Sequence, residues 1–361
     1  MKFFGLMIAV AMGSVLMSFT PKEQLTESLV ADSTLRQSFI EPAPFTVRQA
    51  IGSRVAIRGV AGFSKSGRPI EAYYFPGTSN KRALVIGGVH GSELSGIAVA
   101  KKLIEQLQKQ QDIYYSVIVI PVLFPDNAEK AVTNPSLIGG VSNVGRYSYV
   151  ESADPNRQMP PLGRAFDPDR PMDFAGRPIE PENQLLLQFI QEFQPQRIVN
   201  LHAIRDVAQG GIYADPRTDS KGIALGYESD NELAIAMAQY IESNGGRVPG
   251  NKLKKQPTAL YHADPRVAMA GQQQKRNLEG SKLPGNRGYG VSLGSWASTA
   301  VDDPINREYN RPAIRLITME FPGYKRPGDY TDPLVQQQSR TNVELFAGSI
   351  RKVFLGDYFV E

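Results

Sequence analysis

The feature that most constrains the fold is the alternation of short apolar runs with segments of helical period. Residues 83–89 form a continuous apolar run of the kind that is buried on both faces of a parallel sheet. From Glu93 the apolar residues recur at helical spacing, and residues 114–122 are again strand-like. A helix is predicted over 182–193 and a third strand over 197–201. This order favours an α/β sheet with helices on both faces.

Further elements are predicted on both sides of this core. They are a hairpin or strand pair over 54–60 and 68–75, a helix over 231–241, a late core strand over 313–321 and a closing helix over 342–354. The segment 134–176 is rich in Gly, Pro, Asp and Arg and is long for a connection. We therefore expect it to form functional surface.

The first residues have the form of an export signal. Lys2 is followed by an apolar stretch, residues 3–17, that is short for a membrane span. We expect residues 1–20 to be a signal peptide, with an uncleaved membrane anchor as the alternative because no small-x-small cleavage site is well defined. Residues 21–45 are polar and are predicted to be a linker. A single folded domain is expected over 46–361, in a periplasmic or extracellular protein.

Composition excludes several kinds of partner and site. The 40 basic and 36 acidic residues give a formal net charge of +4, without the Lys/Arg block that follows a nucleic-acid backbone. Nucleic-acid binding is therefore not expected. The chain has no cysteine, so it can form no disulfide and offer no thiolate to a metal. Any metal site must use nitrogen and oxygen ligands.

Two of the three histidines fall at the ends of predicted core strands. His90 ends the first strand, Glu93 follows it across a tight turn, and His202 ends the strand over 197–201. Open α/β folds place their sites at this edge of the sheet. Two imidazoles and a carboxylate are a common catalytic zinc set, although they accept other divalent metals and a lone His-x-x-Glu also occurs without a metal. His262 has no strand-end context and is expected to be structural or on the surface.

Glu320 and the run from Asp154 to Arg157 are further candidates. Glu320 ends an apolar strand, where a carboxylate needs a partner; a metal supplies one, and a salt bridge at the sheet edge is the alternative. In the long loop, Arg157 could grip a carboxylate while Asn156 donates beside it. Most loop arginines are simply solvated, so this signal is weaker.

Together these residues resemble the pattern of the zinc metallocarboxypeptidase superfamily of carboxypeptidase A-like enzymes. Its members carry a His-x-x-Glu pair after a core strand, an Asp-x-Asn-Arg motif, a distant His and a late Glu. The matching residues here are His90, Glu93, 154–157, His202 and Glu320. The resemblance covers about residues 50–350. It implies an α/β fold, a three-layer α/β/α sandwich around a mixed, mainly parallel sheet of about eight strands.

The resemblance also implies roles for individual residues. One zinc ion per chain would be held by His90, Glu93 and His202. Glu320 would be the general base, and Asn156 with Arg157 would anchor the free carboxylate of the substrate. Arg146 is similar in position to the arginine that polarises the scissile carbonyl, with Arg164 as the competing candidate.

Within the superfamily, the stretch 290–296 and the export signal are most similar to bacterial murein peptide amidases and peptidoglycan-trimming carboxypeptidases. The expected function is zinc-dependent hydrolysis of an amide near the free carboxylate end of a peptide or muropeptide. Two departures are that Gln158 stands where the family usually has an aromatic, and that Trp296 and Ser298 occupy the zone of a mobile tyrosine. The alternatives are an N-acyl amino acid deacylase of the succinylglutamate desuccinylase and aspartoacylase type, and a catalytically silent peptide- or glycan-binding protein.

Overall fold

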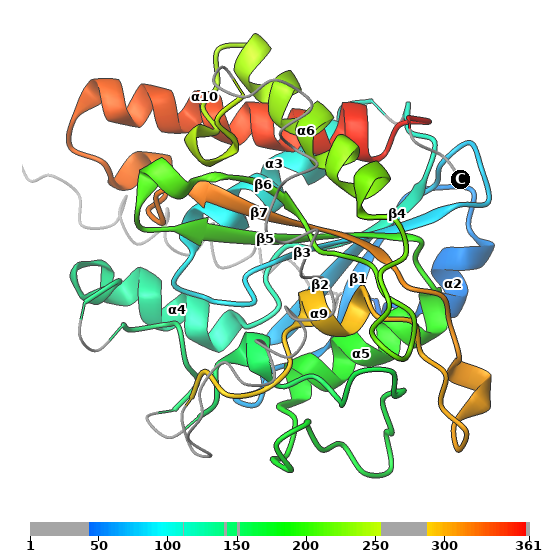
Figure 1. Ribbon diagram of the computed structural model, residues 1–361. Coiled ribbons are helices and arrows are strands. Elements are labelled where there is room, and N and C mark those ends of the chain that lie inside the picture. Colours follow the sequence, from blue (N-terminus) through cyan, green and yellow to red (C-terminus); the bar gives the residue numbers. More distant parts are fainter. Residues whose placement is uncertain (1–42, 111, 141–142, 150–151, 254–286, 359–361) are drawn as a thin grey trace, which may run out of the picture. The chain divides into compact units, whose positions relative to one another are not determined.

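The computed structural model describes residues 43–358, except 111, 141–142, 150–151 and 254–286 (Figure 1). The expected signal peptide (1–20), nearly all of the expected linker (21–45) and His262 lie outside these described residues. No helix in the described ranges is both long enough and apolar enough to cross a bilayer. Export therefore stays a prediction from the sequence.

A mixed sheet forms the centre of the described fold. Its strands are β1 (Ile57–Phe63), β2 (Pro69–Phe75), β3 (Arg82–Gly87), β4 (Ser116–Ile120), β5 (Arg197–Ile204), β6 (Gly211–Ala214) and β7 (Arg315–Pro322). Their order is β1-β2-β4-β3-β5-β7-β6. The four central strands are parallel, whereas β1, β2 and β6 run antiparallel to their neighbours. The predicted α/β class is confirmed, with seven strands among the described residues instead of about eight.

Helices cover both faces of this sheet (Figure 1). On one face lie α3 (Leu94–Lys109), α6 (Tyr227–Ser243) and α10 (Pro333–Ser349), and on the other α2 (Val47–Gly52), α5 (Pro181–Phe193) and α9 (Leu293–Ala297). The helix α4 (Pro125–Thr133) follows β4, and a π-helical turn, η8 (Ile350–Phe354), continues α10. Short 3₁₀ turns are η1 (Pro135–Leu137), η2 (Pro155–Arg157), η3 (Val207–Gln209), η4 (Pro249–Asn251), η6 (Arg307–Tyr309) and η7 (Pro327–Asp329).

The apolar side chains of β3 pack toward both layers of helices. Ala83 and Val85 belong to the core under α3, α6 and α10, whereas Leu84 and Ile86 belong to the core under α2, α5 and α9. Successive side chains of a strand point to opposite faces, so a strand covered on both sides has no solvent face and needs no polar residue. This explains why the run contains no alternation in the sequence.

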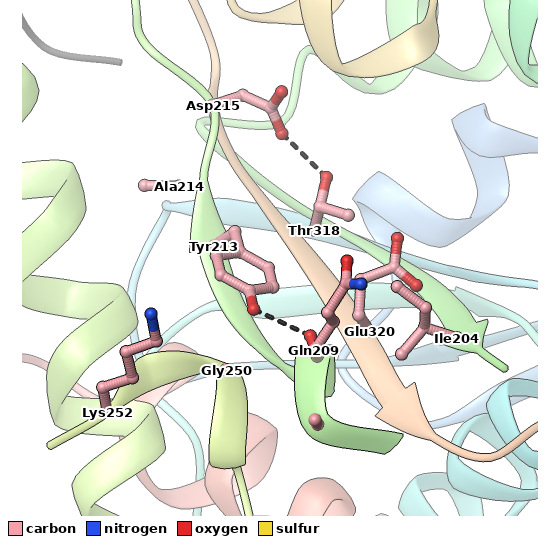
Figure 2. Close-up of a pocket in the computed structure, with 10 residues that line it drawn as sticks. Ile204, Gln209, Tyr213, Ala214, Asp215, Gly250, Lys252, Thr318 and Glu320 are labelled. Carbon is pink, nitrogen blue, oxygen red and sulfur yellow. Dashed lines mark hydrogen bonds between the residues drawn. The ribbon is translucent and has the colours of Figure 1, made fainter. Parts of the chain in front are cut away.

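One face of the sheet changes from apolar to polar toward the carboxyl ends of the strands. On β5, Ile198 packs in the α5 layer and His202 follows on the same face. On β7, Leu316 packs in the same layer and is followed by Thr318 and Glu320, which line a cavity (Figure 2). His202 and Glu320 are directly paired in the parallel register. The polar half of this face therefore collects the candidate site residues.

Among the helices and strands that the structure describes, α2, α4, α9 and β6 were not predicted from the sequence. The strand β6 has four residues, starts with Gly211 and lies at the edge of the sheet, where it pairs with β7 alone. A strand this short has no sustained period to detect. The predicted hairpin is the antiparallel pair β1 and β2, and the other predicted helices and strands coincide with observed elements, with shifted ends.

A buried ionic cluster connects α6 to β7. Asp230 accepts hydrogen bonds from Nε of Arg217 at 2.7 Å and from Nε of Arg315 at 2.6 Å. The side chain of Asp230 is fully buried, and those of Arg217 and Arg315 are 13% and 4% exposed. Charges taken out of water in this way are tolerated only when they are paired. Asp230 therefore pairs with two arginines at once.

Replacing Asp230 by Ala should lower the free energy of unfolding by about 3–5 kcal/mol, because the buried guanidinium of Arg315 would lose the carboxylate that lies 2.6 Å from its Nε. Urea denaturation followed by circular dichroism measures the change. The control is Glu71→Ala, which removes the more exposed pair of Glu71 with Arg58. That variant should lose less than about 1 kcal/mol. Equal small losses in both variants would show that the cluster does not contribute in this way.

Candidate metal centre and active site

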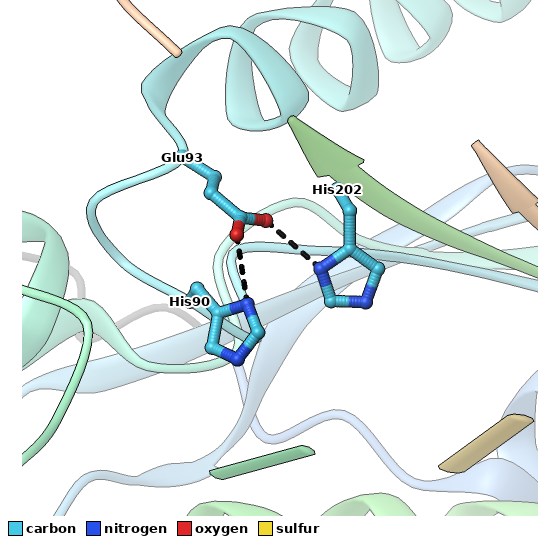
Figure 3. A group of neighbouring side chains, drawn as sticks. All are labelled: His90, Glu93 and His202. Carbon is cyan, nitrogen blue, oxygen red and sulfur yellow. Dashed lines mark hydrogen bonds and ion pairs between the residues drawn. The ribbon is translucent and has the colours of Figure 1, made fainter. Parts of the chain in front are cut away.

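The carboxyl edge of the sheet brings the three predicted metal ligands together. His90 lies in the turn after β3, Glu93 directly precedes α3, and His202 lies in β5. All three side chains are buried, and their ligand atoms lie within 4.8 Å of one another (Figure 3). In the part of the chain that the structure describes, no other group of three or more His, Asp or Glu side chains converges in this way.

A glycine permits the turn that carries His90 into the site. A Cβ on Gly91 would collide with the backbone of Asn127 and Ala128 at the start of α4. Only a residue without a side chain fits in so close an approach of two backbone segments. The turn between His90 and Glu93 therefore packs directly on α4, which holds both ligands near the end of β3.

The Glu93 carboxylate joins the two imidazoles. Its Oε1 lies 2.9 Å from Nδ1 of His90, and its Oε2 lies 2.8 Å from Nδ1 of His202 (Figure 3). The backbone N–H of Ala203 donates to Oε2 at 3.1 Å. Burial acts to raise the pKa of Glu93, but the neighbouring imidazoles outweigh burial and hold this pKa well below its usual range. Glu93 is therefore a carboxylate at every physiological pH.

Asp154 fixes the orientation of His90. Its Oδ1 lies 2.7 Å from Nε2 of His90, which leaves Nδ1 facing Glu93. The backbone N–H of Asn156 donates to the same Oδ1 at 2.8 Å, so the carboxylate is itself held in place. Metal-binding histidines commonly use their second ring nitrogen in this way. No role of its own was predicted for Asp154 from the sequence, although it is the first residue of the Asp-x-Asn-Arg motif.

The donor set suits a zinc ion. Zinc takes imidazole nitrogen and carboxylate oxygen at about 2.0–2.2 Å, so two ligand atoms on one ion are at most about 4 Å apart. The Nδ1 atoms of His90 and His202 each lie under 3 Å from an oxygen of Glu93, at 2.9 and 2.8 Å. Two neutral imidazoles and a carboxylate leave an open position, as catalytic zinc sites require.

Glu320 lies next to this group. It is paired with His202 in the sheet register and lines a cavity of about 450 Å³ (Figure 2). Burial raises the pKa of Glu320 above that of an ordinary glutamate, against the opposing effect of His202. A carboxylate with a raised pKa at the edge of a cavity is suited to accept and return protons.

Arg146 and Asn156 lie beside the ligands. Arg146 donates from Nη1 to Oε1 of Glu93 at 3.1 Å and from Nη2 to Oδ2 of Asp154 at 2.9 Å. Nδ2 of Asn156 lies 3.4 Å from Nε2 of His202. By contrast, the competing candidate Arg164 extends to Asp303 at 3.5 Å, with 49% of its side chain exposed. The geometry favours Arg146 as the arginine of the site.

Arg157 follows Asn156 in η2 and is partly exposed. Its Nη1 donates to the backbone oxygen of Asn156 at 2.6 Å, and it forms no ion pair with any described residue. Asn156 is anchored from the other side, because its Oδ1 accepts the backbone N–H of Leu293 at 2.9 Å. The guanidinium of Arg157, which has no ion pair among the described residues, thus lies beside the Asn156 amide, which is held in place.

The two departures from the family pattern are structural in character. Gln158 is buried, donates to Glu180 at 3.0 Å and accepts from Asn183 at 3.1 Å, so it joins the loop to α5. Trp296 is fully buried and its Nε1 donates to the backbone oxygen of Arg164 at 2.9 Å. Trp296 therefore belongs to the core and does not replace a mobile tyrosine.

Metal binding at neutral pH should release the proton of His90. Burial lowers the pKa of His90, but Asp154 and Glu93 outweigh burial and raise it to about 9. The metal-free imidazole is therefore protonated at pH 7, and a metal must displace that proton. Zinc affinity should rise about tenfold per pH unit from this group up to about pH 9. Calorimetric titrations in buffers of different ionisation enthalpy count the released protons.

The variant Asp154→Asn tests whether Asp154 orients His90 and raises its pKa. It should weaken zinc binding by a factor of about 10–100, because His90 loses its orienting partner. It should also release fewer protons at pH 8, because losing the carboxylate lowers the pKa of His90. The control is Asp329→Asn, which removes a surface ion pair with Arg326. Unchanged zinc affinity in Asp154→Asn would contradict the orienting role.

Several solved structures are similar to this chain. Murein-tripeptide amidase MpaA from Escherichia coli O157 is 18% identical, with a TM-score of 0.42 and with 85% of this chain and 98% of that chain covered. Carboxypeptidase A from Helicoverpa armigera is 14% identical, with a TM-score of 0.45 and coverage of 91% and 80%. A succinylglutamate desuccinylase/aspartoacylase family protein from Shewanella amazonensis SB2B is 14% identical, with a TM-score of 0.41 and coverage of 83% and 73%.

These likenesses are too low to distinguish between the activities of the three proteins. A search of curated protein sequences found no match. The family model for zinc carboxypeptidases, however, matches residues 48–263, which is more than half of the chain. The match contains His90, Glu93 and His202, whereas Glu320 lies beyond it. The chain belongs to the zinc carboxypeptidase family.

Proposed function

We propose that the protein is an exported zinc-dependent peptidase or amidase that cuts an amide near the free carboxylate end of a peptide. The proposed substrate is a peptidoglycan stem peptide. The observation that carries the proposal is the register pairing of His202 with Glu320, which places a carboxylate of raised pKa beside the convergent ligand set. A protein that only binds peptides needs no such combination.

His90, Glu93 and His202 would hold one zinc ion per chain. Zinc bound there would supply Lewis-acid chemistry, making water more acidic and polarising the scissile carbonyl. Asp154 keeps the ring of His90 in the required orientation through its contact at 2.7 Å. Burial of all three ligands keeps bulk water away, which strengthens every electrostatic interaction in the site.

Glu320 carries the proton through the reaction. It accepts the proton of the attacking water and returns it to the leaving amine, and burial, which raises its pKa, favours its holding the proton between the two transfers. Arg146 stabilises the negative charge that develops on the carbonyl oxygen, since Glu93 and Asp154 hold its guanidinium beside the candidate ligands. In the same transition state, Glu320 thus takes the proton and Arg146 stabilises the negative charge on the carbonyl oxygen.

Asn156 and Arg157 bind the free carboxylate of the substrate. The guanidinium of Arg157 has no ion pair among the described residues, so its planar fork is available for a bidentate contact. Asn156 is fixed between His202 and the start of α9, which sets the distance from the clamp to the metal ligands. Holding the carboxylate there determines which amide lies in the site.

The metal-loaded protein should cleave purified muropeptides, with the products read by mass spectrometry. Glu320→Gln should keep its zinc and its substrate affinity but lose turnover by a factor of roughly 10² to 10⁴, because an amide cannot accept the proton of water. Glu344→Gln, an exposed carboxylate on α10, is the matched control and should retain full activity. Simple N-acyl amino acids are digested in parallel.

The products separate the alternatives. Cleavage of N-acyl amino acids alone would replace the proposal by a deacylase of the succinylglutamate desuccinylase and aspartoacylase type. Absence of any cleavage by zinc-loaded protein would indicate a binding protein. If Glu320→Gln retained normal turnover, Glu320 would not be the base.

Amidation of the terminal carboxylate of the substrate should weaken the wild type strongly and Arg157→Ala little, because the variant has already lost the clamp. Arg157→Ala should also raise KM and lower kcat/KM, since the contact exists in both ground and transition states. Arg164→Ala, whose side chain extends to Asp303, is the control and should respond to amidation as the wild type does. Equal effects of amidation on wild type and Arg157→Ala would mean that another residue reads the carboxylate.

A further inference from the structure

The loop that carries Asp154 is tied to the segment that leads into α9, which is yellow in Figure 1. The backbone N–H of Asp154 donates to the oxygen of Arg287 at 2.8 Å. Further along, the backbone N–H of Met159 donates to the oxygen of Val291 at 3.2 Å. A side chain that fixes this pairing of segments therefore also fixes the site residues of the loop.

The side chain of Arg287 fixes the pairing at the Asp154 end. Its Nε donates to the backbone oxygen of Ser152 at 2.8 Å, and its Nη2 donates to that of Tyr149 at 2.5 Å. Its guanidinium carbon lies 3.4 Å from the centre of the Tyr147 ring, so the two planar groups are in contact. One planar side chain thus holds three residues of the loop that precede Asp154.

Asp154 passes this restraint to the candidate metal centre. Its Oδ1 lies 2.7 Å from Nε2 of His90, and its Oδ2 accepts a hydrogen bond from Arg146 at 2.9 Å. The Tyr147 ring that contacts Arg287 also lies 5.9 Å from the guanidinium carbon of Arg146. A displacement of Asp154 would therefore disturb His90 and Arg146 together.

A second arginine makes similar contacts at the Arg157 end of the loop. Nη2 of Arg177 donates to the backbone oxygen of Arg157 at 3.1 Å and to that of Tyr289 at 2.8 Å. Asp173, whose side chain is fully buried, holds Arg177 through an ion pair of 2.7 Å. Arg177 therefore restrains the same two segments, but at the proposed carboxylate clamp and not at the orienting partner of His90.

We propose that Arg287 is a positioning residue of the metal centre. It holds Asp154 in place, and Asp154 in turn orients the ring of His90. A lysine cannot substitute for it, because an ammonium has neither the planar fork that reaches two carbonyl oxygens nor the flat face that contacts Tyr147. The expected effect on zinc binding needs only the metal site, whereas the expected effect on turnover rests on the proposed function.

Zinc affinity, measured by competition with a chelating indicator, tests the proposal without any hydrolysis. Arg287→Lys should weaken zinc binding about tenfold, the lower end of the range for outer partners of metal ligands. Arg177→Lys, which loosens the same two segments at the clamp, should leave zinc affinity unchanged. Arg307→Lys is the surface control, because this exposed arginine also donates to a backbone oxygen, at 3.2 Å.

Two results would overturn the proposal. One is equal zinc affinity in the wild type and Arg287→Lys. The other is an equal loss of zinc affinity in Arg287→Lys and Arg177→Lys, since that would indicate a general loosening of the loop and no specific effect on His90.

Tyr147→Leu is the second variant, for the case that circular dichroism shows Arg287→Lys to be unfolded. It removes the ring beside the guanidinium and keeps both hydrogen bonds of Arg287. Zinc binding should weaken about two- to fivefold, the size of one cation–π contact at a partly exposed site. Unchanged zinc affinity in this variant would overturn the proposal in that case.

Peptide hydrolysis, measured with zinc in excess, gives an independent comparison. Arg287→Lys should lower kcat and leave KM nearly unchanged, whereas Arg177→Lys should raise KM, because the clamp acts in binding. The expected difference in zinc affinity, without hydrolysis by the wild type, would support the positioning role while removing the proposed function. Hydrolysis by the wild type, with unchanged zinc affinity in Arg287→Lys, would overturn the positioning role and leave the proposed function standing.

Discussion

The rest of the site depends on one buried carboxylate, Glu93, which is shared by two imidazoles. A charge in this position is stable only because every lone pair has a partner: the two Nδ1 atoms, the N–H of Ala203 and the guanidinium of Arg146. These partners come from the turn after β3, from β5 and from the long loop. Folding of this edge therefore requires all three segments at once, and a metal would take over the role that the imidazoles have toward the carboxylate.

The register of the sheet places Glu320 beside the group formed by Glu93 and the two imidazoles. On the face covered by α5 and α9, the first residues of β5 and β7 are apolar. The later residues on the same face include His202, Thr318 and Glu320. Glu320 has the candidate metal ligand His202 of β5 on one side and, on the other, the cavity that β6 borders.

The sequence was sufficient to predict His90, His202 and Glu320 as neighbours, because each ends an apolar run and parallel strands align their carboxyl ends. It was not sufficient to predict Asp215, which lines the cavity beside Glu320. That residue follows a four-residue edge strand, and it reaches the cavity only through the register of β6 with β7 and the hydroxyl of Thr318. Orientation by Asp154 was likewise invisible, because it depends on how the long loop folds back over β3 and not on a local period.

In the sequence, residues 290–296 are notable only for their resemblance to a subgroup of the family. In the structure this stretch includes most of α9, and the contacts of α9 give it a structural role. Ser292 caps the helix by accepting the N–H of Ser295 at 3.1 Å, and Trp296 anchors it in the core. Between them, the N–H of Leu293 holds Asn156 and the bare Cα of Gly294 admits the carboxylate of Asp215. Adjacent residues of one short helix therefore hold Asn156 and leave room for the carboxylate of Asp215. Because Asn156 also lies 3.4 Å from Nε2 of His202, a change in this helix would be transmitted to a candidate metal ligand.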